Sequence, residues 1–402
     1  MKVRMPIVVF VLILTTFVSL CAGQSVKSLP ADLLGELEGV PYRILVPENW
    51  NGTLLVYAHG YGESGPPLAP KAADVDALLA EGYAMAASNF AGTGWTVKEG
   101  MQNTVALTAA FRGMIGNPKT TILWGKSMGG LMALGMIEKF PGLYDGAVAI
   151  CPPAAGTPRR FDQGLDITIA YAVAFGWDTA WGTPGDLRDD LDFSTEVAPI
   201  VKGQLTDDRW EFIRRVNGIP PDSYVPANRA LSLYFAMGVR AELESRAGGP
   251  VAGNIGRVYT LTQQDKEALA AMGISADPLL DQMNLMKYAA ERSARNYASR
   301  YVNPSGLLDR PVITMHTEGD PVATPSNEGA YRATVEQQGN EDLLLQQFVP
   351  KGAHCTFTSA QELAGIDAMV EWLKTGIRPD PAIFFPTTLG FDPFYVPPPW
   401  PW

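Results

Sequence analysis

The sequence predicts an α/β fold built on a mostly parallel, doubly wound sheet. Short apolar runs alternate with helix-like segments through the first half of the chain, and this alternation resumes at Pro311. Residues 154–305 instead carry helix-like stretches and no strong strand run. Continuous apolar strands separated by helices are typical of a parallel sheet covered on both faces. We therefore expect one α/β domain, over residues 24–153 and 306–378, which a helical lid over residues 154–305 interrupts.

The expected strands are apolar runs, and the longer periodic stretches are the expected helices. Strands are predicted over residues 42–46, 54–58, 83–90, 120–124, 147–151, 312–316 and 343–349. Helices are predicted over residues 106–114, 129–140, 208–216, 230–243, 265–272 and 279–301, and a last helix begins at Ser359 and ends at Gly376. Two of these helices begin with capping-box patterns, Thr262 with Asp265 and Ser359 with Glu362.

The composition excludes several functional classes. The chain has 402 residues, of which 47% are hydrophobic, so it is too apolar to be a disordered chain. It has 31 Lys+Arg and 42 Asp+Glu, which give a formal net charge of −11. A general nucleic-acid binder carries a basic face, so we expect no nucleic-acid partner.

The first 23 residues are typical of a secretory signal peptide. Lys2 and Arg4 precede an apolar stretch over residues 7–20, and a Cys-Ala-Gly run places small residues before the expected cleavage point. The alternatives are an uncleaved anchor and a lipoprotein with a lipid on Cys21, although the residue before this cysteine is bulky for lipidation. No later stretch is long and apolar enough to span a bilayer. We therefore expect a secreted or periplasmic protein without a stable membrane span.

The main chemical signal is the run Trp-Gly-Lys-Ser-Met-Gly-Gly over residues 124–130. It contains a G-x-S-x-G pattern between a predicted strand and a predicted helix, where a serine lies on a tight turn with its hydroxyl lifted clear of the sheet. Side chains in place of Gly125 and Gly129 would collide across that turn. The sequence therefore predicts a nucleophile elbow with Ser127 as the nucleophile.

A serine hydroxyl is a poor nucleophile without a base, and the chain has three histidines. All three fall at or just after the end of a predicted strand, which is where open α/β sheets build their sites. We expect His354, which follows the last strand, to be the base. His316 is expected to be buried and to serve in packing or hydrogen bonding.

An acid is needed to orient the base and to stabilise its charged form. Asp320 follows the strand over residues 312–316 and is the expected acid, with Glu318 as the alternative. The resulting chain order is Ser127, Asp320, His354, which is not the order of the trypsin or subtilisin types.

An oxyanion that forms on the substrate needs backbone N–H donors. Met128, directly after the serine, is one expected donor. The second is expected from the loop His59-Gly60-Tyr61-Gly62, most simply from Tyr61, because glycines let the backbone approach the substrate closely.

These features together resemble the α/β-hydrolase superfamily over roughly residues 41–153 and 306–377. The resemblance implies a sheet of about eight strands and acyl-transfer chemistry, and it places residues 154–305 where this superfamily has its lid. Lys126 departs from the His or Tyr that often precedes the serine, which concerns the subfamily and not the three expected catalytic residues.

Cys151 ends a predicted strand and Cys355 follows His354, so both are expected near the same edge of the sheet. A bridge between them would brace the histidine loop. The pair partly resembles that of the tannase-like feruloyl esterases, where a cysteine beside the histidine pairs with one beside the serine. Residue 126 is Lys here, so that pattern is not met, and the sequence leaves a bridge and two free thiols both open.

Three weaker signals have structural interpretations. The acidic group Asp186, Asp189, Asp190 and Asp192 lacks the ordered spacing of a calcium loop and is expected to be a solvated face. The aromatic residues Trp177, Trp181, Trp210, Tyr234 and Phe235 either line an apolar pocket or form the core of the lid. The tail over residues 379–402 is rich in proline and aromatic residues and is expected to pack on the body.

The sequence thus predicts a secreted serine hydrolase that cleaves carboxylic esters and needs no metal or organic cofactor. The expected substrate is a small-molecule or polymeric ester of moderate hydrophobicity. A serine peptidase, such as an aminopeptidase, and an acyltransferase are the enzymatic alternatives. A non-catalytic binding protein on the same fold is disfavoured by the intact order of the three expected catalytic residues.

Overall fold

The computed structural model describes residues 28–62, 72–221 and 225–402. The predicted signal peptide over residues 1–23, with Cys21, lies outside the described residues. No helix in the described part of the chain is long and apolar enough to cross a membrane.

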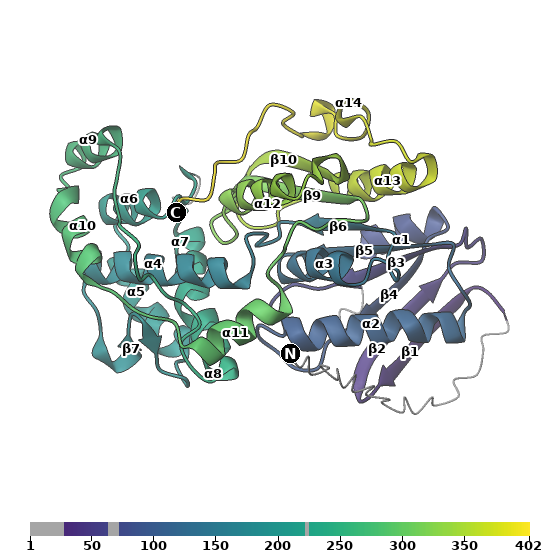
Figure 1. Ribbon diagram of the computed structural model, residues 1–402, viewed down its shortest axis with the longest axis horizontal. Coiled ribbons are helices and arrows are strands. Elements are labelled where there is room, and N and C mark those ends of the chain that lie inside the picture. The colour runs from purple at the N-terminus through teal and green to yellow at the C-terminus, as the bar shows by residue number, and fades with distance from the viewer. Residues whose placement is uncertain (1–27, 63–71, 222–224) are drawn as a thin grey trace, which may run out of the picture.

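An eight-stranded sheet forms the centre of the larger part of the molecule (Figure 1). Its strands are β1 (Ala31–Leu37), β2 (Val40–Val46), β3 (Thr53–Ala58), β4 (Ala84–Ser88), β5 (Thr120–Lys126), β6 (Gly146–Ile150), β9 (Val312–Gly319) and β10 (Leu344–Gly352). They are ordered β1-β2-β4-β3-β5-β6-β9-β10. Only β2 runs against the others, since it pairs antiparallel with both β1 and β4. The predicted fold class, a mostly parallel sheet of about eight strands, is confirmed.

Helices cover both faces of this sheet. Alternate residues of β3 point to opposite faces, so Leu54 and Val56 join one buried cluster while Leu55 and Tyr57 join another. The first cluster includes side chains of α2 (Val97–Met114), α3 (Met128–Lys139) and α12 (Ser326–Gln337), and the second includes those of α1 (Ala72–Ala80) and α13 (Ser359–Thr375). Both faces are apolar, which explains why most strands are continuous apolar runs.

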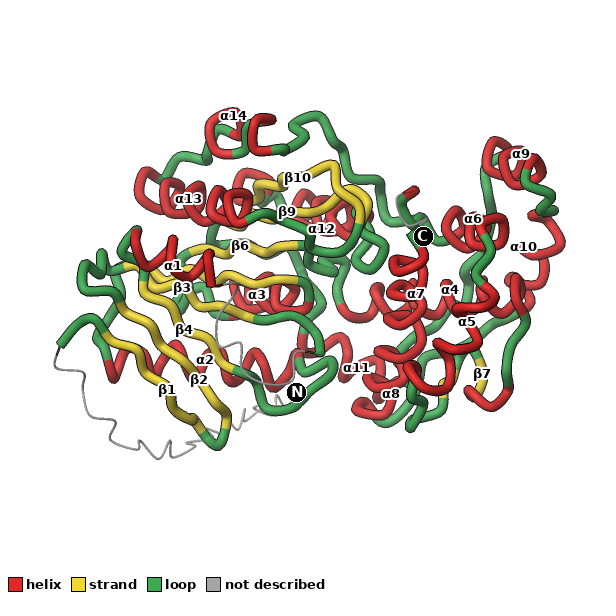
Figure 2. The backbone as a smooth tube through the Cα atoms, turned by 180° about the vertical axis from the view of Figure 1, so that it is seen from behind, coloured by secondary structure: helices red, strands yellow, loops and turns green. Residues whose placement is uncertain are grey.

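A helical insertion separates β6 from β9 and lies beside the sheet (Figure 2). It contains α4 (Thr157–Phe175), α5 (Ala198–Gln204), α6 (Asp207–Val216), α7 (Pro226–Leu233), α8 (Val239–Ala247), α9 (Gln263–Ala271), α10 (Ala276–Leu285) and α11 (Arg292–Tyr301). A two-stranded ribbon, β7 (Gly182–Thr183) with β8 (Asp186–Leu187), lies among them, and a π-helical segment, Tyr234–Gly238, joins α7 to α8. Whether this insertion acts as a lid stays a prediction.

The expected helix over residues 279–301 is wrong, because the chain there forms α10 and α11 with a break between them. In the break, the N–H of Tyr288 donates to Asn254 Oδ1, and the N–H of Asn254 donates to the Tyr288 carbonyl. The N–H of Glu291 donates to the Pro250 carbonyl. These bonds to a distant loop replace helical bonds, so tertiary contacts override the local helix propensity.

The expected cap of the last helix is also wrong by one residue. Thr358, not Ser359, caps α13: its side chain accepts from the N–H of Gln361, and the Gln361 side chain accepts from the N–H of Thr358. The expected capping residue of α9 is correct, since the Thr262 side chain accepts from the N–H of Asp265.

The C-terminal tail packs on both parts of the molecule. After α14 (Pro381–Phe384), Phe385 and Phe391 are buried, and the N–H of Asp392 donates to the Phe348 carbonyl on β10. The tail then crosses to the insertion, where the ring of Trp402 lies 4.7 Å from the Arg257 guanidinium. One aromatic residue of the tail, Phe394, is 87% exposed.

The corrected cap can be tested by substitution. Thr358→Ala removes the side chain that accepts from the first turn of α13, and we expect it to lower the free energy of unfolding by about 1 kcal/mol. Ser359→Ala, the matched control, should cost clearly less. Chemical denaturation of both variants measures the difference, and equal losses would contradict the assignment.

Candidate active site

Ser127 lies on the sharp turn between β5 and α3. Its backbone has φ 54° and ψ −120°, a region that L-residues rarely adopt. A Cβ on Gly125 would lie 2.3 Å from the Gly129 carbonyl oxygen, and a Cβ on Gly129 would lie 2.1 Å from the Ala58 carbonyl oxygen. The two glycines therefore allow the turn that presents Ser127 at the carboxyl edge of the sheet.

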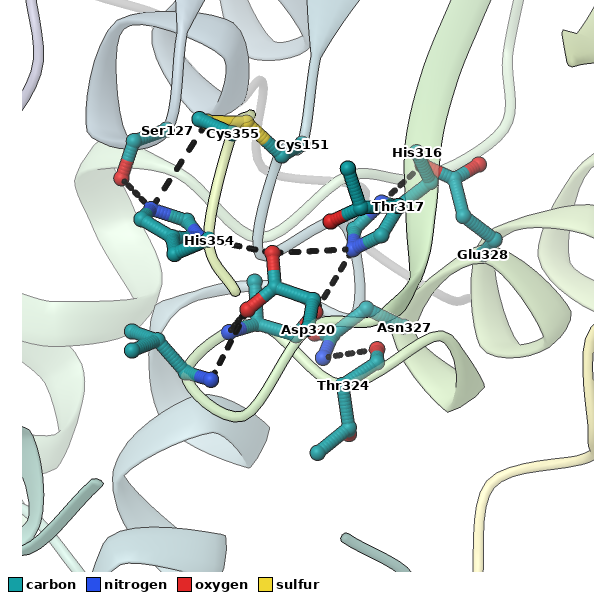
Figure 3. Close-up of polar contacts among 12 residues, drawn as sticks. Ser127, Cys151, His316, Thr317, Asp320, Thr324, Asn327, Glu328, His354 and Cys355 are labelled. Carbon is teal, nitrogen blue, oxygen red and sulfur yellow. Dashed lines mark hydrogen bonds and ion pairs between the residues drawn. A yellow bond between two sulfur atoms is a disulfide. The ribbon is translucent and has the colours of Figure 1, made fainter. Parts of the chain in front are cut away.

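The structure brings Ser127, His354 and Asp320 together in one chain of hydrogen bonds (Figure 3). His354 Nε2 lies 2.8 Å from Ser127 Oγ, and His354 Nδ1 lies 2.6 Å from Asp320 Oδ2. A carboxylate only accepts, so Nδ1 donates to Asp320, and Nε2 of the neutral ring is left to accept from the serine hydroxyl. This is the geometry that proton transfer from the serine requires.

Asp320 is fully buried and has a partner on each oxygen. Its Oδ1 accepts from the N–H groups of Val322, at 2.8 Å, and of Ala323, at 3.0 Å. Burial alone raises the pKa of this carboxyl, but the charges and hydrogen bonds of His354 and His316 outweigh it and lower the pKa to about 2. The alternative acid, Glu318, lines a surface cavity with Tyr395 instead.

His316 lies behind Asp320 and is completely buried. Its Nδ1 lies 3.0 Å from Glu328 Oε1, and its Nε2 lies 2.6 Å from the Ala323 carbonyl and 3.5 Å from Asp320 Oδ2. Burial lowers the pKa of His316, but Asp320 and Glu328 raise it to about 10. Both ring nitrogens therefore donate, and His316 is a buried cation between two carboxylates rather than a neutral packing residue.

The loop that carries His354 is braced on two sides. Cys151 and Cys355 form a disulfide with a Cα–Cα distance of 5.6 Å. The Thr317 hydroxyl donates to the Ala353 carbonyl at 2.8 Å. Cys151, His354 and Cys355 place metal-ligand atoms within 4.8 Å of one another, but both sulfurs are bonded in the disulfide and are not thiolate ligands.

Backbone strain is concentrated at this site. Six non-glycine residues of the described part of the chain have positive φ, and four of them surround the hydrogen-bonded chain: Ser127, Cys151, Ala353 and Cys355. Such conformations persist only where the surrounding structure enforces them, and they cluster at functional sites. The disulfide joins two of these four residues, and the elbow holds a third.

Lys126, the residue that departs from the expected pattern, has a structural partner. Its Nζ lies 2.5 Å from Glu362 Oε2 on α13, and the Glu362 side chain is almost fully buried. This ion pair ties the end of β5 to the helix that follows the histidine loop. Lys126 therefore helps to fix the position of Ser127 relative to the loop that carries His354.

The expected oxyanion donors lie on either side of Ser127. Met128 is the first residue of α3, where a backbone N–H has no partner within the helix. A Cβ on Gly60 would lie 3.6 Å from Ser127 Cβ, so the loop that carries Tyr61 passes directly beside the serine. His59 stacks on Phe90, with 3.8 Å between ring centroids, and its Nδ1 donates to the Gly60 carbonyl at 2.8 Å. The role of these donors stays a prediction.

The five aromatic residues singled out in the insertion divide into two groups. Trp177 packs against Trp181, and both Trp181 and Trp210 are buried within the insertion. Phe235 instead has its ring centroid 6.4 Å from that of His354 and 5.5 Å from that of Tyr61. The ring centroid of Tyr234 lies 6.2 Å from that of Tyr61, so Tyr234 and Phe235, two neighbouring residues of the π-helical segment, both lie close to the site.

The acidic group at residues 186–192 has local protein partners. Asp190 pairs with Arg188 at 2.5 Å, and Asp192 Oδ1 accepts from the N–H groups of Ser194 and Thr195. These contacts agree with a solvated polar face.

Sequence reasoning missed two buried residues at the site. Glu328, on α12, pairs with His316, and Arg160, on α4, lies close enough to Asp320 for their charges to interact. Burial lowers the pKa of Arg160 to about 10, so it is charged at neutral pH. Neither residue belongs to a motif, and only the three-dimensional packing of α4 and α12 against the sheet edge reveals them.

No protein-family model matches the chain. It is 25% identical to the o-phthalyl amidase of Xanthobacter agilis over 418 residues, which cover 86% of this chain and 88% of that protein. Similar solved structures include an esterase from Aspergillus oryzae, with 16% identity and a TM-score of 0.46 over 87% of this chain and 80% of that one. Another is an esterase of Pyrococcus furiosus, with 13% identity and a TM-score of 0.45 over 87% of this chain and 91% of that one. These values are low, so the fold assignment rests on the strand order.

The charge on His316 predicts a pH dependence of stability. Its pKa is raised from 6.5 to about 10 in the folded protein, so its contribution to stability is full below about pH 6.5 and is lost as the pH rises toward 10. We expect the gap in free energy of unfolding between the wild type and His316→Gln to shrink over this range. Denaturant titrations at several pH values measure the gap. A gap that is constant from pH 6 to 10 would contradict a charged His316.

The disulfide predicts a second effect. Replacing both Cys151 and Cys355 by alanine should lower the free energy of unfolding by about 2–4 kcal/mol and reduce turnover, because the His354 loop loses a brace. A reductant should likewise lower the stability and turnover of the wild type, and it should change neither quantity in the double variant. In the denatured, unreduced protein we expect no reactive thiol besides Cys21, where that residue is retained. Two further thiols would show that the bridge is absent.

Proposed function

We propose that this protein, which has the α/β-hydrolase fold, is a secreted serine hydrolase that cleaves carboxylic esters through an acyl-enzyme. The observation that carries this proposal is the chain of hydrogen bonds from Ser127 through His354 to Asp320. The cysteine pair supports an oxidising compartment, which agrees with the signal-like N-terminal sequence.

In the first step, Ser127 Oγ attacks the acyl carbonyl while His354 Nε2 takes the hydroxyl proton. Asp320, already bonded to Nδ1, holds the ring in the required tautomer and stabilises the imidazolium that forms. The backbone N–H groups of Met128 and Tyr61 donate to the oxyanion. Because Asp320 is paired on both oxygens and stays ionised, it is ready for this role before the substrate binds.

In the following steps, His354 returns the proton to the leaving alcohol, and the acyl group stays on Ser127. Water then enters, His354 takes one of its protons, and the resulting hydroxide attacks the acyl carbon. Collapse of this second intermediate releases the carboxylic acid and returns the proton to Ser127. No step draws on a metal or an organic cofactor.

The aromatic group over the site supports a moderately hydrophobic substrate. Phe235 lies beside His354, and Tyr61 and Tyr234 pack against Phe235 and each other. Aromatic side chains of this kind favour apolar acyl or aryl groups. Two of these three residues belong to the insertion, so we propose that the insertion is a lid that helps to bind the substrate.

Amide hydrolysis is the second candidate, and the similarity to the o-phthalyl amidase favours it. The same residues serve both bonds, since His354 can protonate a leaving amine as well as a leaving alcohol. Ester and amide hydrolases of this kind differ in their substrate-binding residues, so a direct comparison of the two bonds decides between them.

The test is hydrolysis of nitrophenyl acetate, nitrophenyl octanoate and the matching nitroanilides. We expect Ser127→Ala to lower turnover on the order of 10⁴-fold or more with an unchanged melting temperature, because it removes the nucleophile. Ser299→Ala, a serine in α11, is the control and should keep full turnover. Turnover that survives in Ser127→Ala would move the nucleophile elsewhere, and faster cleavage of the anilides would select the amidase.

A further inference from the structure

Among the described residues, the buried cation of Arg160 has no carboxylate within 4 Å. Its side chain is 2% exposed, and its Nη1 makes no hydrogen bond within the described structure. The three other buried arginines of the described chain each have an acidic neighbour within 4 Å: Arg214 with Glu211, Arg229 with Asp207, and Arg240 with Glu244. A guanidinium carries five N–H donors, and burying it without partners is costly.

The guanidinium lies at the candidate active site. It stands 5.8 Å from the ring centroid of Phe235, and the same ring contacts Tyr61 and lies 6.4 Å from the His354 ring. The Phe235 ring therefore contacts both regions. His354 and the oxyanion loop lie near it, and so does the Arg160 guanidinium. Arg160 is also close enough to Asp320 for their charges to interact.

Asp320 does not serve as the partner of Arg160. Its Oδ2 accepts from His354 and lies 3.5 Å from His316, and its Oδ1 accepts from two backbone N–H groups. The Asp320 carboxylate is thus already stabilised by the charge of His316 and by three hydrogen bonds. Within the described structure, Nη1 of Arg160 stays available to another acceptor.

Gly164, one turn along α4 from Arg160, lies where α4 packs against the π-helical segment. A Cβ there would lie 3.8 Å from Arg160 Nη1 and 3.4 Å from Ala236 Cα in the π-helical segment. The guanidinium therefore lies at the junction of α4 with the segment that carries Phe235.

We propose that Arg160 binds a carboxylate of the substrate, so that the preferred substrate is an ester or amide that also carries a free carboxylate. This inference rests on the proposed function and names its substrate class. A planar guanidinium matches a carboxylate with two parallel N–H···O bonds, which gives orientation as well as affinity. The aromatic wall would hold the apolar part of the same substrate between Arg160 and Ser127.

The first test compares matched esters that differ in one charge. One pair is the nitrophenyl monoester of glutaric acid against nitrophenyl pentanoate, and the other is 4-acetoxybenzoate against phenyl acetate. These pairs place the carboxylate on the acyl side and on the alcohol side, respectively. Rates are corrected for spontaneous hydrolysis, and the readout is the ratio of kcat/KM for the charged ester to that for its neutral match.

In the wild type we expect a kcat/KM ratio above one in at least one pair. Arg160→Met should lower that ratio at least tenfold, mainly through KM. The ratio for Arg160→Lys should lie between those of the wild type and Arg160→Met. Arg209→Met, an arginine of α6 whose guanidinium lies 5.6 Å from the Phe175 ring, is the matched control and should keep the wild-type ratio. Equal losses on charged and neutral esters would overturn the proposal, because they would show that Arg160 acts only through Asp320 or the fold. A wild-type ratio of one or less in both pairs would overturn it too.

The second test does not depend on turnover. Calorimetry of glutarate and benzoate with Ser127→Ala should show binding that weakens at least tenfold when Arg160→Met is added. If the wild type shows no serine-dependent hydrolysis, the proposed function fails. This binding measurement still tests whether Arg160 binds a carboxylate. Equal binding by the single and the double variant would overturn the carboxylate site.

Discussion

A fully buried carboxylate, that of Asp320, is the group around which the site is organised. An isolated buried charge is costly, so its neighbours are constrained: each oxygen must be paired, and an opposite charge must lie close by. His354, two backbone N–H groups and the cation of His316 meet these demands. Because His316 is in turn held by Glu328, the network reaches from the elbow through β9 to α12.

This network pairs the polar groups of the site with one another in the absence of a substrate. The positions of Ser127 and His354 depend on strained backbone that the disulfide, the Lys126–Glu362 pair and the Thr317 hydroxyl hold in place. Fixed donors and acceptors lose little free energy to reorganisation during a reaction. The sheet places the elbow and the histidine loop at one edge, and these cross-links hold the two in position.

Much of the sheet and of the site could be predicted from the sequence, because both have local signatures. The G-x-S-x-G pattern, the residues after β9 and the histidine after β10 each follow a recognisable strand, and parallel strands end at one edge. Arg160 and Glu328 had no such signature, since each sits inside a helix and reaches the site only through packing. The break after α10 was missed for a related reason: its hydrogen-bond partners lie more than 30 residues away in the sequence.

The edge strand β1 and the cap of α13 were harder to predict from the sequence for a different reason. β1 alternates half-exposed and exposed residues at the edge of the sheet, so it lacks the apolar run that marked the central strands. Thr358 and Ser359 are both good caps, and sequence alone does not say which one adopts the extended backbone that capping needs.

The cysteine pair has a consequence for the covalent architecture. Cys151 and Cys355 are 204 residues apart, and the whole insertion lies between them, so the insertion and β9 and β10 form one closed ring of chain. A protease that nicks an exposed loop of the insertion would open this ring without releasing a fragment. The sulfur bridge would still hold the histidine loop next to the elbow. The bridge likewise fixes the distance between the histidine loop and the elbow, whatever the length of the insertion between Cys151 and Cys355.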